Sequence, residues 1–124
     1  QFFSPGIPQV YYGGLLAADN DMELLAKTNV GRDINRPYLS TADVEAAIEK
    51  PVVKGLIELI KIRNDSNAFN GDFSVSYNDK LLALNWAHHS DTACLEIDFN
   101  TMSAVIDITD AGKSTTITIS ELLG

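Results

Sequence analysis

The sequence predicts an α+β chain in which a short strand, a loop and helices precede a small antiparallel β-sheet. Three observations carry this prediction. A continuous apolar run spans 7–12, apolar residues recur with the helical period across 44–60, and apolar residues alternate beyond Gly71. The change of period divides the 124-residue chain near residue 70. We therefore expect one part over residues 1–69 and a second over residues 70–124.

The run Ile7 to Tyr12 predicts a strand buried on both faces, because its apolarity is continuous. Pro8 removes a ladder donor, which confines the expected strand to residues 9–12. Of Tyr11 and Tyr12, which could stack on a sugar or lie in the core, we expect one to be a core residue. A lone strand of the parallel type lacks partners in this sequence. We therefore expect a piece of a longer protein, or partners from a second copy.

Helices are expected at 20–27, 41–49 and 51–64. The first begins with an asparagine that has a glutamate three residues on, which resembles a capping box. Ser40 opens the second helix. Pro51 interrupts the apolar pattern, and a proline inside a helix costs about 3 kcal/mol, whereas the first position tolerates it. The pattern therefore predicts two consecutive helices, with Pro51 at the start of the last.

About five strands are expected beyond Gly71, because apolar residues there recur every second position. Turn-forming residues separate these runs at 78–79, 88–91, 100–101 and 111–112. Such alternation is typical of an antiparallel sheet with one face in water. The second part of the chain is therefore predicted to be a small all-β unit.

Composition excludes several classes of function. The net charge of −8 disfavours nucleic-acid binding, which needs clustered basic residues. No run approaches the ~18 apolar residues of a transmembrane helix, so no membrane partner is expected. No metal-ligand spacing is present, so no metal site is expected. Cys94 is the only cysteine, and the absence of a disulfide partner favours a cytoplasmic location.

No catalytic residue is expected in this chain. A triad takes its members from separate elements, so the neighbouring residues His88 to Asp91 are better explained as a hairpin turn. A carboxylate pair must converge across one bond, and the sequence gives no reason for convergence. The acids considered are Asp19, Asp21, Glu23 and Asp33.

The stretch Val30 to Tyr38 is unusually rich in side chains that form fixed hydrogen bonds. Arg32 and Arg36 flank Asp33 within it, and the nearby glycine and proline limit any helix to one turn. Two interpretations remain open from the residues alone. The loop is braced by its own Arg–Asp hydrogen bonds, or one arginine projects into a cleft to recognise hydroxyls, carboxylate or phosphate.

Two motifs together carry a resemblance to a known family. The segment SPGIPQVYYGG, Ser4 to Gly14, resembles the eighth barrel strand of the α-amylase superfamily of glycoside hydrolases. The longer segment GIPQVYYGGLLAADNDMELLAKTNVGRDINR is similar to the sucrose phosphorylase branch, for which Gly-Arg-Asp-Ile-Asn-Arg is a signature. The resemblance covers the whole chain but corresponds only to the C-terminal quarter of such an enzyme.

The resemblance implies the end of a (β/α)8 barrel followed by a small antiparallel C-terminal domain. Residues 1–12 would then be the last barrel strand, residues 13–40 its following loop, and residues 41–65 helices outside the barrel. Residues 70–124 would be the C-terminal domain. Because barrel active sites lie at the carboxyl ends of the strands, the loop would line the substrate cleft.

The reaction implied is a retaining transfer of glucosyl from sucrose to phosphate, which yields α-glucose 1-phosphate and fructose. Inorganic phosphate is a co-substrate, and no cofactor is implied. The catalytic acids of the family belong to earlier strands, so the fragment is expected to be inactive alone. The matching family arginine makes Arg32 the expected substrate-binding residue, and Asp33 and Arg36 are expected to brace its loop.

One residue departs from the family pattern. Pro37 stands where the branch carries histidine, and this leaves the donor and acceptor open. Sucrose 6'-phosphate, glucosylglycerol and glucosylglycerate remain alternative substrates. A non-enzymatic β-module with a helical arm is the alternative from another class. A homodimer contact through the exposed barrel remnant is also expected.

Overall fold

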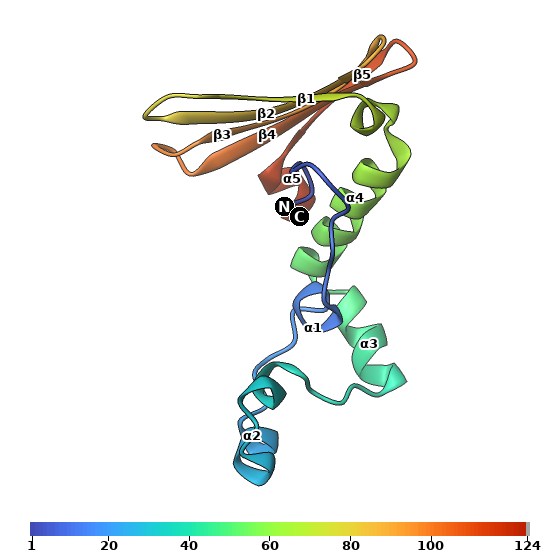
Figure 1. The fold of residues 1–124 in the computed structure, drawn as a ribbon. Helices are drawn as coiled ribbons and strands as arrows, with labels where there is room; N and C mark the ends of the chain where they lie inside the picture. Colours follow the sequence, from blue (N-terminus) through green and yellow to red (C-terminus); the bar gives the residue numbers. More distant parts are fainter. Residues whose placement is uncertain (124) are drawn as a thin grey trace.

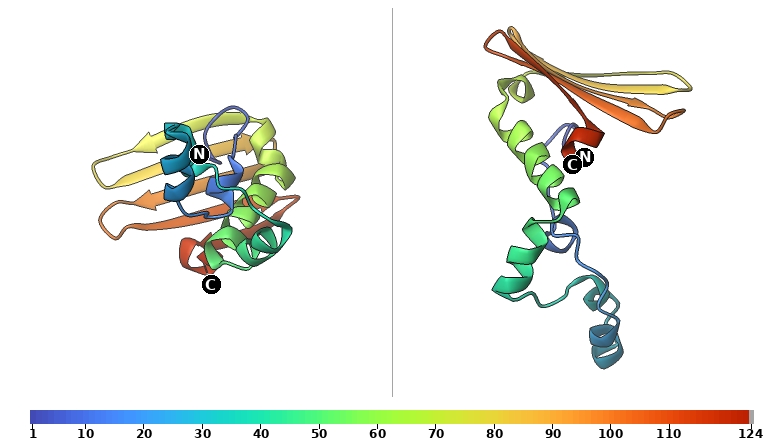
Figure 2. Two further views of the ribbon diagram at one scale, coloured as in Figure 1. Left: turned by 90° about the horizontal axis from the view of Figure 1, so that it is seen from below. Right: turned by 180° about the vertical axis from the view of Figure 1, so that it is seen from behind.

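A five-stranded sheet forms one end of the molecule, and a helical arm extends away from one of its faces (Figure 1). The structure is a computed structural model that describes residues 1–123. Views from below and from behind place the helices on the same side of the sheet (Figure 2). None of the helices in this range is long and apolar enough to cross a membrane.

The sheet is a simple meander in which each strand is antiparallel to the next. Its strands are β1 (Asp72–Tyr77), β2 (Leu81–His88), β3 (Asp91–Asp98), β4 (Ser103–Asp110) and β5 (Lys113–Thr118). The turns between them fall at the predicted positions. The five-stranded antiparallel sheet expected from the sequence is therefore confirmed.

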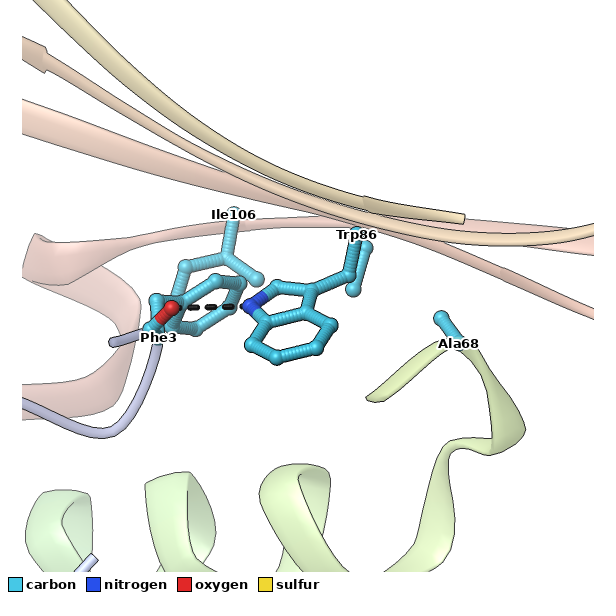
Figure 3. Packing of buried hydrophobic residues seen from close by; sticks show 5 residues of the cluster. Phe3, Ala68, Trp86 and Ile106 are labelled. Atoms are coloured by element: carbon cyan, nitrogen blue, oxygen red, sulfur yellow. Dashed lines mark hydrogen bonds between the residues drawn. The ribbon is translucent and has the colours of Figure 1, made fainter. Parts of the chain in front are cut away.

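The register places Trp86 at the centre of the covered face, opposite Phe73 on β1 and Ala93 on β3. Trp86 is 7% exposed, and its indole Nε1–H donates a hydrogen bond of 2.8 Å to the carbonyl oxygen of Phe3 (Figure 3). Phe3 is itself 2% exposed and belongs to the same cluster as Ala68 and Ile106. The start of the chain is thus anchored in the core of the sheet.

Among residues 1–123, four helices precede the sheet and one follows it. They are α1 (Tyr12–Leu15), α2 (Met22–Thr28), α3 (Thr41–Ile48) and α4 (Pro51–Asp65), with α5 (Ile119–Leu123) after the last strand. Two 3-10 turns are η1 (Gly31–Asn35) and η2 (Asn67–Asn70). Pro51 occupies the first turn of α4, as predicted. The residue that caps α2 is Asp21 rather than Asn20, and its carboxylate accepts a hydrogen bond from the Leu24 amide.

The strand predicted at residues 9–12 is absent from the described residues. The backbone at Tyr11 is extended, but no neighbouring segment pairs with it, and Tyr12 begins α1. A strand needs a hydrogen-bonded neighbour, and this chain supplies none at that place. The expectation that one tyrosine of the pair is a core residue was also wrong. Tyr11 is 42% exposed and Tyr12 is 43% exposed.

A capping box begins α3. The Ser40 hydroxyl accepts from the Asp43 amide, and the Asp43 carboxylate accepts from the Ser40 amide at 2.8 Å. The hydrogen bonds from Ser40 lower the pKa of the Asp43 carboxyl below its usual range. Both hydrogen bonds matter, because each one satisfies a backbone N–H group that has no acceptor within the helix.

Replacing Ser40 with alanine is expected to destabilise the chain by about 1 kcal/mol, the usual loss for an N-cap. The depressed pKa of Asp43 stabilises the folded state above the ordinary carboxyl pKa of about 3.9. That contribution disappears as the pH falls through the lower folded value. Urea unfolding at pH 7 and pH 3 checks both effects, and the variant should differ less from the native chain at pH 3. An equal difference at both pH values would contradict the contribution of the ionised Asp43 carboxylate, and the absence of any difference at pH 7 would contradict the capping role of Ser40.

Candidate functional site

The residues singled out from the sequence lie together in a surface pocket of about 380 Å³. Arg32 and Asp33 are in the turn η1, and Arg36 is the residue that ends it. Four further residues from three other parts of the chain complete the lining, namely Tyr11, Tyr12, Leu24 and Tyr38. The pocket therefore combines two guanidinium groups, one carboxylate and three phenols.

Backbone hydrogen bonds hold the turn in shape. The Asp33 amide donates to the Val30 carbonyl at 2.9 Å, and the Arg36 amide donates to the Asp33 carbonyl at 3.2 Å. A third bond of 2.7 Å joins the Asp21 amide, at the start of α2, to the Ile34 carbonyl. The backbone of the turn is thus tied to α2 as well as to itself, which fixes the position from which its side chains project.

The start of α1 supports the turn from the other side. The Tyr12 hydroxyl donates a hydrogen bond of 3.1 Å to the Pro37 carbonyl, across 25 residues of sequence. Gly13 is buried, and a Cβ placed there would lie 3.1 Å from the Asn35 carbonyl oxygen. Glycine at this position therefore permits the close approach of α1 to η1.

The two tyrosines form an aromatic wall beside Arg36. The rings of Tyr11 and Tyr12 are 4.6 Å apart between centroids, and the guanidinium carbon of Arg36 lies 5.9 Å from the Tyr11 ring. Desolvation and the neighbouring Tyr12 raise the pKa of the Tyr11 phenol, while Arg36 opposes that shift. The phenol therefore stays protonated near neutral pH and can donate a hydrogen bond.

Arg32 lines the pocket and is exposed. Across residues 1–123 the ion pairs are Lys54–Glu49 and Lys61–Glu58, so Asp33 pairs with neither arginine. The guanidinium of Arg32 is therefore available for a ligand. Its planar fork of donors suits adjacent hydroxyls or a phosphate. Its role in substrate binding, and the bracing role of Asp33 and Arg36, stay predictions.

A larger hollow of about 590 Å³ lies beside α2 and α3. Its rim carries acids, namely Asp19, Asp21, Glu23 and Asp43. Within residues 1–123 no three acidic, histidine or cysteine side chains gather closely enough to hold a metal ion. Because this hollow lacks the arginines and the tyrosine wall, we place the candidate site at the smaller pocket.

The sequence of the chain is similar to that of known sucrose phosphorylases. No family model matches the chain. It is 50% identical over 107 residues to a sucrose phosphorylase of Agrobacterium vitis, a match that covers 86% of this chain and 22% of the relative. It is also 50% identical over 99 residues to a sucrose phosphorylase of Bifidobacterium adolescentis, covering 79% of this chain and 20% of the relative.

The chain belongs to the sucrose phosphorylase family. A solved structure of sucrose 6F-phosphate phosphorylase from Thermoanaerobacter thermosaccharolyticum agrees, with 40% identity and a TM-score of 0.89. That match covers 96% of this chain and 25% of the solved chain. The chain thus spans about a fifth to a quarter of the length of these relatives. It corresponds to a C-terminal fragment of a sucrose phosphorylase family member. The resemblance and the α+β fold class predicted from the sequence are confirmed.

Sequence reasoning missed two residues of the pocket. Tyr38 is 88% exposed, and Leu24 comes from α2, seven residues before the signature begins. The position of Tyr38 directly after Arg36-Pro37 was a usable signal, because aromatic residues and arginine are enriched at binding surfaces. Nothing in the sequence around Leu24 distinguishes it from an ordinary residue of an amphipathic helix.

Proposed function

We propose that this chain is part of a retaining phosphorylase that converts sucrose and phosphate into α-glucose 1-phosphate and fructose. The observation that carries the proposal is the 50% identity to two sucrose phosphorylases over 86% and 79% of the chain. On this proposal residues 1–69 are the end of the catalytic barrel and residues 70–124 are its C-terminal domain. The family catalytic acids lie outside the chain, so the chain alone is inactive.

Within that enzyme, Arg32 binds the glucosyl unit through hydrogen bonds to its hydroxyls. Two features of the pocket support this role. The Arg32 guanidinium is exposed and has no ion-pair partner among residues 1–123, and the adjacent tyrosine rings offer a surface on which a sugar ring can stack. Asp33 and Arg36 hold the turn that carries Arg32. A shared hydroxyl-recognising residue suits the whole family, because each member transfers a glucosyl unit.

Two other donors have specific support. The chain is 45% identical over 111 residues to a glucosylglycerol phosphorylase of Marinobacter adhaerens, and 44% identical over 108 residues to a sucrose 6(F)-phosphate phosphorylase. These values lie close to the 50% that favours sucrose. Pro37 departs from the sucrose-type pattern and removes a titratable side chain beside Arg36. Sucrose 6'-phosphate and glucosylglycerol are therefore the second candidates.

An assay of the full-length protein separates these donors. It should release glucose 1-phosphate from sucrose plus inorganic phosphate, with a higher kcat/KM than from sucrose 6'-phosphate or glucosylglycerol. The 124-residue chain alone serves as the control and should release none. If sucrose 6'-phosphate or glucosylglycerol gives the higher kcat/KM, that compound replaces sucrose as the proposed donor. Release of free glucose without glucose 1-phosphate would instead indicate a hydrolase and contradict it.

The proposal also includes a cytoplasmic location, which rests on the single cysteine, and self-association through the exposed segment before α3. That segment carries several exposed apolar side chains, including Ile7 at 97% and Met22 at 61% exposure. Sedimentation of the chain over a range of concentrations tests the second point. A monomer at all concentrations would remove self-association from the proposal.

A further inference from the structure

The segment that carries the tyrosine wall runs alongside α4, and the views from front and back agree on this (Figures 1 and 2). Two basic residues hold it, one near each end of that helix. The Lys50 ammonium donates a hydrogen bond of 2.9 Å to the Ala17 carbonyl, and the Arg63 Nη2 donates one of 2.8 Å to the Gly6 carbonyl. The helix therefore holds residues 6–17 at both ends.

The Arg63 end of this arrangement is fixed by aromatic packing. The guanidinium carbon lies 4.3 Å from the Phe69 ring centroid and 4.9 Å from the Trp86 ring centroid. Desolvation lowers the pKa of Arg63, although an arginine remains charged at neutral pH. Cation–π contacts with two rings restrict the motion of the guanidinium, and they connect the Arg63–Gly6 hydrogen bond to the core of the sheet.

The Lys50 end lies at the cap of α4 and is exposed. Its acceptor, Ala17, has a left-handed backbone with φ of 47°, an unfavourable conformation for a residue with a Cβ. The charged hydrogen bond to its carbonyl compensates for part of that cost. The Ala17 carbonyl lies two residues after α1, and the amides of Leu16 and Ala18 on either side of it donate to the carbonyls of Tyr12 and Gly13 in α1. Lys50 therefore holds the segment that directly follows α1.

Between these two ends the segment touches the arginine turn. Tyr12 donates to the Pro37 carbonyl, and Gly13 lies against Asn35. Leu56, from the middle of α4, lines one hollow together with Tyr11 and Gly13. The hydrogen bond from Lys50 to Ala17 and the one from Tyr12 to Pro37 thus link α4, through the α1 segment, to the turn that carries Arg32.

We propose that Lys50 and Arg63 are positioning residues, and that α4 is the rigid support that sets the place of the Arg32 turn. The β-sheet then contributes to the site at a distance, because it holds Arg63 through Trp86. The structural part of this inference stands on the contacts in this chain. Its consequence for sugar binding rests on the proposed function of Arg32.

Amide hydrogen exchange on the 124-residue chain tests the structural part. Lys50→Met should speed exchange at Leu15, Leu16 and Ala18 about fivefold, the factor expected for one lost hydrogen bond, and at the Asp21 amide to a smaller extent. Arg63→Met should have an effect of similar size or larger. Lys54→Met and Lys61→Met are the matched controls, because they remove the same charge from exposed residues of α4 without freeing a carbonyl.

If Lys50→Met leaves these amides as protected as in Lys54→Met, the proposal is overturned. Should Arg63→Met unfold the chain, Lys50→Met and the conservative Arg63→Lys still decide the question. Arg63→Lys should restore part of the protection, since it keeps a charged donor.

Kinetics of the full-length protein test the consequence for binding. Lys50→Met should lower kcat/KM about fivefold, mainly by raising KM for the glucosyl donor. Its thermal unfolding midpoint should equal that of the Lys54→Met control. If Lys50→Met speeds amide exchange but leaves the kinetics unchanged, the support from α4 does not affect sugar binding, and the proposed effect on Arg32 is overturned. An enzyme that lacks phosphorylase activity altogether would contradict the proposed function while the exchange result still stands.

Discussion

Replacing Arg32 with alanine in the full-length protein is expected to lower kcat/KM for the glucosyl donor by about 100-fold. Hydrogen bonds to a charged group contribute roughly 1.5–3 kcal/mol each, and the upper part of this range corresponds to that factor. Arg32 is exposed in the pocket and has no ion-pair partner among residues 1–123, so its loss should not disturb the fold. Initial rates of glucose 1-phosphate release at several donor concentrations provide the measurement.

Two control variants show whether the loss of activity is specific to the Arg32 guanidinium. Arg32→Lys keeps the charge but loses the planar pair of donors, so it should recover only part of the activity. Lys27→Ala removes an exposed charge from the neighbouring helix α2 and should change the kinetics little. Arg32→Ala with the same kinetics as Lys27→Ala would show that Arg32 does not contact the substrate.

Replacing Trp86 with alanine should destabilise the chain by about 3–5 kcal/mol. This residue fills the centre of the core, contacts the rings of Phe69 and Phe73, and donates the hydrogen bond that anchors Phe3. Domains of this size are stable by roughly 5–15 kcal/mol, so the variant would be close to unfolding. Urea unfolding followed by circular dichroism measures the change, because the only tryptophan is lost.

Two further variants separate packing from hydrogen bonding at this position. Trp86→Phe keeps much of the apolar volume and loses only the indole donor, so it should be less harmful than alanine. Tyr77→Ala removes an aromatic residue that is 81% exposed on the same face of the sheet, and it should cost less than about 0.5 kcal/mol. Equal losses for Trp86→Ala and Tyr77→Ala would contradict the central role given to Trp86.

The sheet was predictable because its signals are local. Period-two alternation and turn residues determine each strand and its neighbour, and every strand here pairs with the next in sequence. The same reasoning found α3 and α4, since Ser40 caps one and Pro51 begins the other. Such signals depend on residues close together in the sequence, which is why the boundaries agree with the structure within a few residues.

Errors arose where the outcome depends on distant partners. An apolar run such as 7–12 forms a strand only beside another strand, and none of the described residues offers one. The burial of Phe3 against Trp86 joins residues 83 positions apart, and no local pattern announces it. The signature around Arg32 gave the candidate site. The sequence also held a signal for Tyr38, whereas Leu24 and the support from Lys50 and Arg63 became visible only in three dimensions.

A crystal structure of the full-length protein with sucrose bound would show whether Arg32 contacts the substrate. We expect the Arg32 guanidinium about 3 Å from a hydroxyl oxygen of the glucosyl unit, within hydrogen-bond distance. We also expect the hydrogen bonds from Lys50 to Ala17 and from Arg63 to Gly6 in that complex. A glucosyl unit bound elsewhere, with Arg32 directed into solvent, would rule out the substrate-binding role of Arg32.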